Sequence, residues 1–280
     1  ENLLTCAVIF YDKTMHTITN YYLLNLATSD IITTLAVLMG AADSFEYATW
    51  SCKIHYLFII VLWNNTILTL TMLSIERFVA IWYPLQFQST SDWRRVLKVI
   101  IVIWVMALLE TIPEFWTLKS LKANKTLFCS TVPTPLARII NGVLALVTFV
   151  IPMIIMSYVY FMIAFKVNVT QKRYSNNKIF NHQDHRKKVN QLVVALALSF
   201  LLCWSPFFTM RMLIFLMEMK QLMAFVKWWL IDEKVMFVTG FFSVVLHPIL
   251  FSLISTKFRE SLKRLWITKI RRREINVTMV

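Results

Sequence analysis

The sequence predicts an all-α membrane protein: a bundle of seven transmembrane helices with a truncated first helix, followed by a short amphipathic eighth helix. Composition is the first observation behind this fold class, because 58% of the 280 residues are hydrophobic and only 16% are charged. The second is arrangement. The apolar residues form long continuous runs, and runs of about 18 residues or more indicate transmembrane helices. A membrane β-barrel would instead show two-residue alternation broken by turns, so helices are favoured.

Seven apolar runs set the bounds of the predicted helices. In chain order they are Leu3–Tyr11, Ile18–Ala42, Cys52–Trp82, Val96–Trp116, Leu136–Val167, Lys187–Met217 and Glu233–Ile254. The first run would cover only about half a bilayer. We therefore expect the first helix to be truncated.

A different pattern follows the seventh run, over Lys257–Ile270. Its apolar residues share one helical face, with basic residues elsewhere, and they are Phe258, Leu262, Leu265 and Trp266. This arrangement favours a short helix lying on the inner leaflet. We expect two units: residues 1–254, a seven-transmembrane domain incomplete at its N-terminus, and residues 255–280, an amphipathic helix with a basic tail.

The net charge of +14 would suit nucleic-acid binding, but the distribution of the bases favours a membrane topology. They gather between Lys166 and Lys188 and in the tail after Lys257, whereas the alternate loops hold fewer. Basic loops tend to stay on the cytosolic side. We expect a multi-pass protein of the plasma membrane, surrounded by lipid, with a cytosolic tail and no nucleic-acid partner.

Two features fall on the outward face in this topology. Cys52 precedes the third helix and Cys129 lies in the loop after the fourth, so a disulfide between them is allowed in that oxidising space. Asn124 begins an Asn-Lys-Thr sequon in the same loop, where glycosylation is expected. Cys6 and Cys203 lie in apolar runs and are expected to be packing thiols.

Asp30 lies in the middle of the second predicted helix. A carboxylate inside the membrane either takes up a proton or finds a cation. One interpretation is a cation or water site facing the bundle interior. The other is a neutral Asp30 hydrogen-bonded to Asn2 or Ser243.

Prolines interrupt the fifth, sixth and seventh helices at Pro152, Pro206 and Pro248. Each removes a backbone hydrogen bond and kinks its helix. Trp204 lies at the bend of the sixth helix, so together the kinks predict a set of hinges. At the cytosolic end of the third helix, Arg77 is expected to snorkel or to pair with its neighbour Glu76.

The order of these features resembles the rhodopsin-like (class A) G-protein-coupled receptors. The matches are Asn2, the Asn25-Leu26-Ala27-Thr28-Ser29-Asp30 segment, Cys52 with Cys129, Glu76-Arg77-Phe78, Trp104, Pro152 with Tyr160, Cys203-Trp204-Ser205-Pro206 and Phe258. Each motif is weak alone, whereas the ordered set, which covers nearly the whole chain, is specific.

The resemblance implies that an outward ligand swings the sixth helix and opens a cytosolic cleft for a heterotrimeric G protein. The residues implied in coupling and activation are Glu76, Arg77, Phe78, Tyr160, Pro248 and Phe251. The implied packing relay comprises Ile67, Pro152, Phe200, Trp204 and Pro206. An interior sodium ion would lie among Asp30, Thr66 and Ser243, and no other cofactor is expected.

Several residues depart from the pattern of that family. Glu76 and Phe78 replace Asp and Tyr, which keeps the charge and the ring. His247 and Phe251 replace the Asn and Tyr of the seventh-helix Asn-Pro-x-x-Tyr motif. The loss of the tyrosine hydroxyl leaves sodium affinity and normal activation open.

The ligand class follows from what the outer half of the bundle contains. The segment Tyr56–Trp63 has no acid to pair with an amine, and no Lys stands in the seventh helix at the place where a retinal Schiff base would form. The candidate ligand-binding residues are Tyr56, Ile59, Trp63, Glu110, Phe207, Phe208, Arg211, Glu233 and Phe237. An aromatic pocket rimmed by acids suits a peptide with a basic residue and an apolar end.

Two local segments indicate one type of receptor within this family. Lys98–Leu109 and Thr19–Leu24 resemble neuropeptide receptors of the neuromedin U, pyrokinin and capa type. That likeness implies a short amidated peptide as the ligand and a Gq-class partner.

The sequence favours a receptor over an enzyme or a transporter. The sequence has no metal-ligand spacing, phosphate loop or nucleophile–base pair, so an enzyme is not expected. Asp30 would suit an ion-coupled transporter, but the paired repeats typical of transporters are not found. A third interpretation, a diverged receptor-like protein with lost or altered coupling, stays open because of His247 and Phe251.

Overall fold

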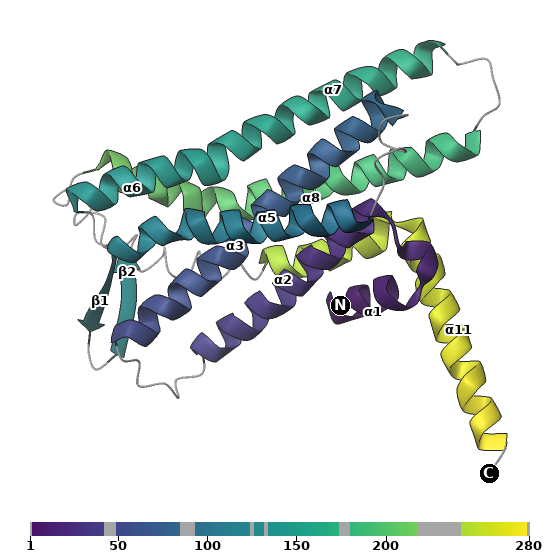
Figure 1. Ribbon diagram of the computed structural model, residues 1–280, viewed down its shortest axis with the longest axis horizontal. Helices are drawn as coiled ribbons and strands as arrows, with labels where there is room; N and C mark the ends of the chain where they lie inside the picture. Colours follow the sequence, from purple (N-terminus) through teal and green to yellow (C-terminus); the bar gives the residue numbers. More distant parts are fainter. Residues whose placement is uncertain are drawn as a thin grey trace.

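The computed structural model describes residues 2–41, 49–84, 93–123, 126–131, 134–173, 180–217 and 242–278. Over these residues it is a bundle of helices with one small sheet (Figure 1). Five helical spans are long and apolar enough to cross a membrane: Ile18–Met39, Lys53–Trp82, Trp93–Trp116, Pro135–Lys166 and Val194–Leu213. Two shorter apolar helices, Asn2–Tyr11 and Phe242–Ile254, accompany them.

The long helices follow the predicted apolar runs closely. Helices α1, α2, α3 and α5 comprise Asn2–Tyr11, Ile18–Ala41, Thr49–Trp82 and Trp93–Thr111. Helices α6, α7, α8 and α11 comprise Pro135–Ala145, Ile151–Arg173, Phe180–Leu216 and Thr256–Thr278. The 242–254 helix (Phe242–Ile254) lies between α8 and α11 in the chain. The shorter segments are η1 (Lys13–Met15), η2 (Ile112–Trp116), η3 (Leu146–Val150), β1 (Leu118–Ala123) and β2 (Thr126–Thr131).

Helix α3 is the centre of the bundle. It packs against α2, α5, α7 and α8, while α6 packs against α8 and α1 against α2 (Figure 1). The core side chains between these helices include Tyr22, Leu70 and Phe200, each at most 1% exposed. Hydroxyl side chains inside the bundle bond to their own helix, as Thr71 does to the carbonyl of Ile67 at 2.8 Å, because lipid offers no alternative partner.

The outer surface of the bundle is apolar. Helix α5 exposes about half of the side chains of Ile101, Val105 and Leu108. An apolar surface of this kind is unfavourable in water and suits a lipid environment. The exposed apolar side chains therefore agree with the membrane environment that the composition predicts.

The hairpin of β1 and β2 was not predicted from the sequence. The strands pair antiparallel and place Ser120 opposite Cys129, in the segment that the sequence analysis treated as a loop. Both strands contact α3, the helix that carries Cys52. The hairpin marks one end of the bundle, which we call the hairpin end (Figure 1).

The bend predicted at Pro152 coincides with a change of helix type. The segment η3, Leu146–Val150, is π-helical and joins α6 to α7 just before Pro152. A π-helical turn accommodates backbone groups that a proline leaves out of the regular ladder. In α8, Pro206 lies inside the helix.

The C-terminal helix differs from its prediction. It runs over Thr256–Thr278 rather than ending at Ile270, because its polar and basic residues are good helix formers. Phe258 is 2% exposed and packs with Leu262 and Leu265 against the core, whereas Trp266 is 66% exposed. The exposed ring of Trp266 is available to lipid, and the placement of this helix on the inner leaflet stays a prediction.

Candidate functional site

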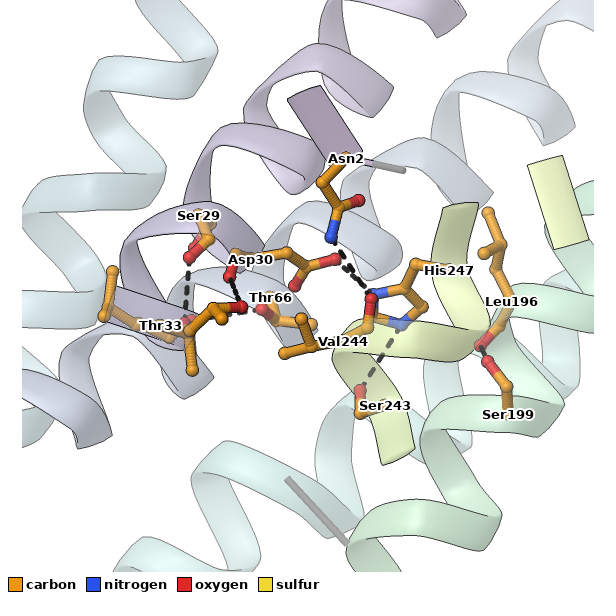
Figure 2. Close-up of polar contacts among 12 residues, drawn as sticks. Asn2, Ser29, Asp30, Thr33, Thr66, Leu196, Ser199, Ser243, Val244 and His247 are labelled. Atoms are coloured by element: carbon orange, nitrogen blue, oxygen red, sulfur yellow. Dashed lines mark hydrogen bonds and ion pairs between the residues drawn. The ribbon is translucent and has the colours of Figure 1, made fainter. Parts of the chain in front are cut away.

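Asp30 and His247 form the polar centre of the bundle. Asp30 lies in α2 and His247 in the 242–254 helix, and both are almost fully buried. Nδ1 of His247 lies 2.9 Å from Oδ2 of Asp30 (Figure 2). A neutral Asp30 was expected to bond to Asn2 or Ser243. In the structure Asn2 instead donates to the carbonyl of Val244 at 3.2 Å.

Ser243 connects this centre to α8. Its Oγ accepts a hydrogen bond from Nε1 of Trp204 at 3.3 Å and lies 3.5 Å from Nε2 of His247. A continuous polar chain of four side chains therefore links α2 to α8 through the 242–254 helix. Thr66, the third residue expected at the sodium site, donates to the carbonyl of Leu62 in its own helix at 3.1 Å.

A second buried network joins α2, α3 and α5. The amide of Asn25 donates to Thr69 Oγ1 at 2.9 Å and accepts from Trp104 Nε1 at 3.0 Å. Asn65 donates to Ser29 Oγ at 3.1 Å. The sequence analysis assigned Asn65 no role, although an amide deep in an apolar run is a signal that could have found it.

Trp204 also borders a cavity on the α3 and α8 side of the bundle. The ring of Trp204 packs against Trp63 and Phe200, with centroids 4.5 and 5.9 Å apart. Phe149 of η3 stacks on Phe208 with centroids 4.1 Å apart. The cavity is lined by Ile60, Trp63, Asn64, Ile67, Thr148, Phe200, Trp204, Phe207, Phe208 and Arg211.

The predicted relay and ligand residues divide around this cavity. Its lining includes relay residues Ile67, Phe200 and Trp204 and ligand residues Trp63, Phe207, Phe208 and Arg211. Pro152 is buried and Pro206 half-buried outside the lining, and Tyr56, Ile59 and Glu110 are likewise half-buried outside it. Glu233 and Phe237 lie outside the described residues, as does the sequon residue Asn124.

A buried ion pair closes the cavity toward the hairpin end. Arg211 of α8 pairs through Nη2 with Oε1 of Glu114 in η2, and their side chains are only 6% and 4% exposed. The guanidinium also lies 4.8 Å from the ring centroid of Phe207. Within the described part of the chain, Nε and Nη1 of Arg211 are buried without hydrogen-bond partners, as is Oε2 of Glu110, which lies outside the cavity lining. Arg211 therefore keeps two donor nitrogens available for a ligand.

At the other end of α3, Glu76 does not pair with Arg77. Its Oε1 forms an ion pair with Nη2 of Arg95 in α5 and accepts from the hydroxyl of Tyr22 at 3.4 Å. The expected Glu76–Arg77 pair is absent from the described contacts because adjacent side chains on a helix point in different directions. Nε of Arg77 is buried without a partner among the described residues.

The remaining predicted coupling residues lie at the same end of the bundle as Arg77. The hydroxyl of Tyr160 in α7 lies 2.6 Å from Oγ of Ser74. Phe78 stacks on Trp82, with ring centroids 5.8 Å apart. Phe251 packs on Phe258 of α11 with centroids 4.7 Å apart, and Pro248 is buried one turn before it. The end of the bundle opposite the hairpin therefore combines an unpartnered guanidinium nitrogen with aromatic packing.

Comparison with known proteins places these features in a family. A family model described as the seven-transmembrane receptors of the rhodopsin family matches residues 1–251. Neuromedin-U receptor 1 of Rattus norvegicus is 27% identical over 304 residues, which cover 94% of this chain and 68% of that receptor. Neuromedin-U receptor 1 of Mus musculus is 29% identical, over 93% of this chain and 68% of its own length.

Another type of receptor is also similar to this chain. Growth hormone secretagogue receptor type 1 of Homo sapiens is 28% identical over 287 residues, which cover 94% of this chain and 76% of that receptor. The resemblance drawn from the ordered motifs is confirmed by these matches. Because the family model covers most of the chain, the protein belongs to the rhodopsin family of seven-transmembrane receptors.

Proposed function

We propose that the protein is a plasma-membrane receptor that binds an extracellular peptide at its hairpin end and activates a heterotrimeric G protein at the opposite end. One observation carries the proposal: Trp204 both borders the ligand cavity and donates to Ser243, so a ligand that moves Trp204 also moves the polar chain. The basic tail then lies in the cytosol.

The chemistry of the cavity supports a peptide ligand. A guanidinium only donates hydrogen bonds, so the N–H groups on the two available nitrogens of Arg211, Nε and Nη1, suit carbonyl oxygens, such as that of a C-terminal amide. The available oxygen of Glu110 suits a basic side chain of the ligand. As packed, the cavity has a volume of about 10 Å³, room for about one water, so an apolar ligand residue would enter by moving apart lining rings such as those of Trp63 and Phe207. Relatives named as neuromedin-U receptors support a neuropeptide ligand, and the resemblance drawn from the sequence implies that it is short and amidated.

Coupling is assigned to the end of the bundle near Trp82. Arg77 holds a buried nitrogen without a partner there, which a G-protein segment would engage when α8 moves outward about Pro206. The family supports a heterotrimeric G protein as the partner, and the Gq class is proposed from the resemblance drawn in the sequence analysis.

The test is a calcium assay in cells that display the receptor at their surface. A library of short amidated peptides is applied, each alongside its free-acid counterpart. We expect a response to at least one amidated peptide and a much weaker response to its acid, because the neutral amide offers both a carbonyl oxygen and N–H donors, whereas a carboxylate only accepts hydrogen bonds and is costlier to bury. Silence toward every peptide, at verified surface expression, would contradict the proposal and favour the diverged receptor.

Two variants test the assignment of the coupling end. Arg77→Ala should abolish the calcium response while peptide binding persists, since Arg77 lies far along α3 from the cavity. The matched control is Lys98→Ala, an exposed basic residue on α5, which should signal as the parent does. Retained signalling by Arg77→Ala would remove the role given to this residue.

A further inference from the structure

The interior site expected to hold sodium is occupied by protein groups. Hard cations such as sodium are bound by several oxygen ligands at once. Here Oδ2 of Asp30 is bonded to His247, and Oγ of Ser243 accepts from Trp204. Thr66 is turned to its own helix, where it donates to Leu62. These residues do not fit a sodium ion.

His247 takes the place of the ion as the partner of the Asp30 carboxylate. A deprotonated carboxylate only accepts hydrogen bonds, so Nδ1 of His247, 2.9 Å away, carries the proton that they share. This holds for the neutral and the cationic ring alike. Figure 2 shows the imidazole inserted between the Asp30 carboxylate and Ser243, with a ring nitrogen directed to each.

In the rest of the polar chain, each hydrogen-bond donor meets an acceptor. The indole Nε1–H of Trp204 can only donate, so Oγ of Ser243 accepts from it. The hydroxyl hydrogen of Ser243 then remains available for Nε2 of a neutral His247, 3.5 Å away. When the ring is cationic, the second lone pair of Ser243 accepts from Nε2–H instead. In both cases Oγ of Ser243 and both ring nitrogens of His247 keep a partner, as buried polar groups require.

We propose that His247 is a tethered replacement for the interior sodium ion, so that this receptor is indifferent to sodium where a receptor with an oxygen ligand at this position would bind it. The inference rests on the proposed function only for its consequence, that Trp204 is connected to Asp30 through protein atoms alone. The replacement itself concerns binding of a cation and is independent of any peptide.

The test measures thermal unfolding of the purified receptor in detergent, in sodium chloride and in N-methylglucamine chloride at equal ionic strength. We expect the Tm of the parent to be the same in the two salts. In His247→Asn, an amide oxygen takes the place of the ring, and Tm should rise with sodium in a saturable way. At a sodium concentration ten times the dissociation constant, the rise is about 3–5 °C.

Each outcome decides the inference. A sodium-dependent Tm in the parent would overturn it, as would a folded His247→Asn that ignores sodium. If His247→Asn does not fold, His247→Gln supplies the same oxygen one carbon further along. His16→Asn, an exposed histidine outside the polar chain, is the matched control and should show no sodium effect. Because no peptide or G protein is present, failure here leaves the proposed peptide receptor untouched.

Discussion

The buried ion pair of Arg211 and Glu114 allows stability and ligand binding to be tested separately. Both side chains are almost fully buried, so replacing Arg211 with Leu leaves the carboxylate of Glu114 charged and unpaired. Removal of one partner of a buried pair costs about 3–5 kcal/mol. For a chain of this size the cost corresponds to a fall in Tm of at least about 6 °C.

The double variant Arg211→Leu/Glu114→Met removes both charges and keeps similar volumes. Replacement of a whole buried pair is close to neutral, so Tm should recover most of the loss. Peptide binding should remain lost, because the available N–H donors of Arg211 are gone. Thermal unfolding in detergent gives Tm, and binding of a labelled amidated peptide gives the affinity.

The control is Arg138→Leu, a partly exposed arginine in α6 that donates to the backbone of Phe215 and should change Tm by little. The reasoning is refuted if Arg211→Leu unfolds within about 1 °C of the control. It is also refuted if the Tm losses of Arg211→Leu and of Glu114→Met, each made alone, simply add in the double variant. Full recovery of peptide affinity in the double variant would instead remove Arg211 from the ligand site.

Three further predictions concern other parts of the bundle. Arg95→Gln breaks the ion pair between α5 and α3 and should lower stability by about 1–3 kcal/mol; an unchanged Tm would contradict this. Burial acts to raise the pKa of Asp12, but hydrogen bonds from Thr14 outweigh it and lower that pKa below its usual value. A group of this kind adds stability above its unfolded pKa and loses it as pH falls through the folded value, so Asp12→Asn should flatten the decline in Tm below about pH 4, and identical pH profiles would refute the assignment. Gly142→Ala places a Cβ 2.5 Å from the ring of Phe215 and should destabilise the contact of α6 with α8 by about 1–3 kcal/mol, measured as Tm; equal stability would mean that the ring moves aside.

Local pattern was sufficient to predict most of the helical architecture. Lipid requires apolar helices about 20 residues long with internally bonded backbones, and such a requirement is visible in single runs of residues. The end of α3 at Trp82 was predicted from its run alone. The hairpin was missed because Leu118–Ala123 and Thr126–Thr131 carry lysines and small polar residues without clear alternation.

Partners within the site were harder to predict than its members. Asp30 was recognised as an interior polar residue because a carboxylate in an apolar run is costly. Its partner His247 is 217 positions away, and nothing near Asp30 in the chain indicates it. Glu76 likewise pairs with Arg95 of another helix rather than with the adjacent Arg77.

By itself the sequence determined that this protein crosses the membrane as a helical bundle and to which receptor family its motifs belong. Only the tertiary structure decided that His247 lies against Asp30, that Arg95 holds Glu76, and that Arg211 keeps two donors available beside Glu114. The physical reason is the sequence separation over which each effect acts. Hydropathy and proline act within one helix. A buried charge pairs with a group on any helix that packing brings within hydrogen-bond distance.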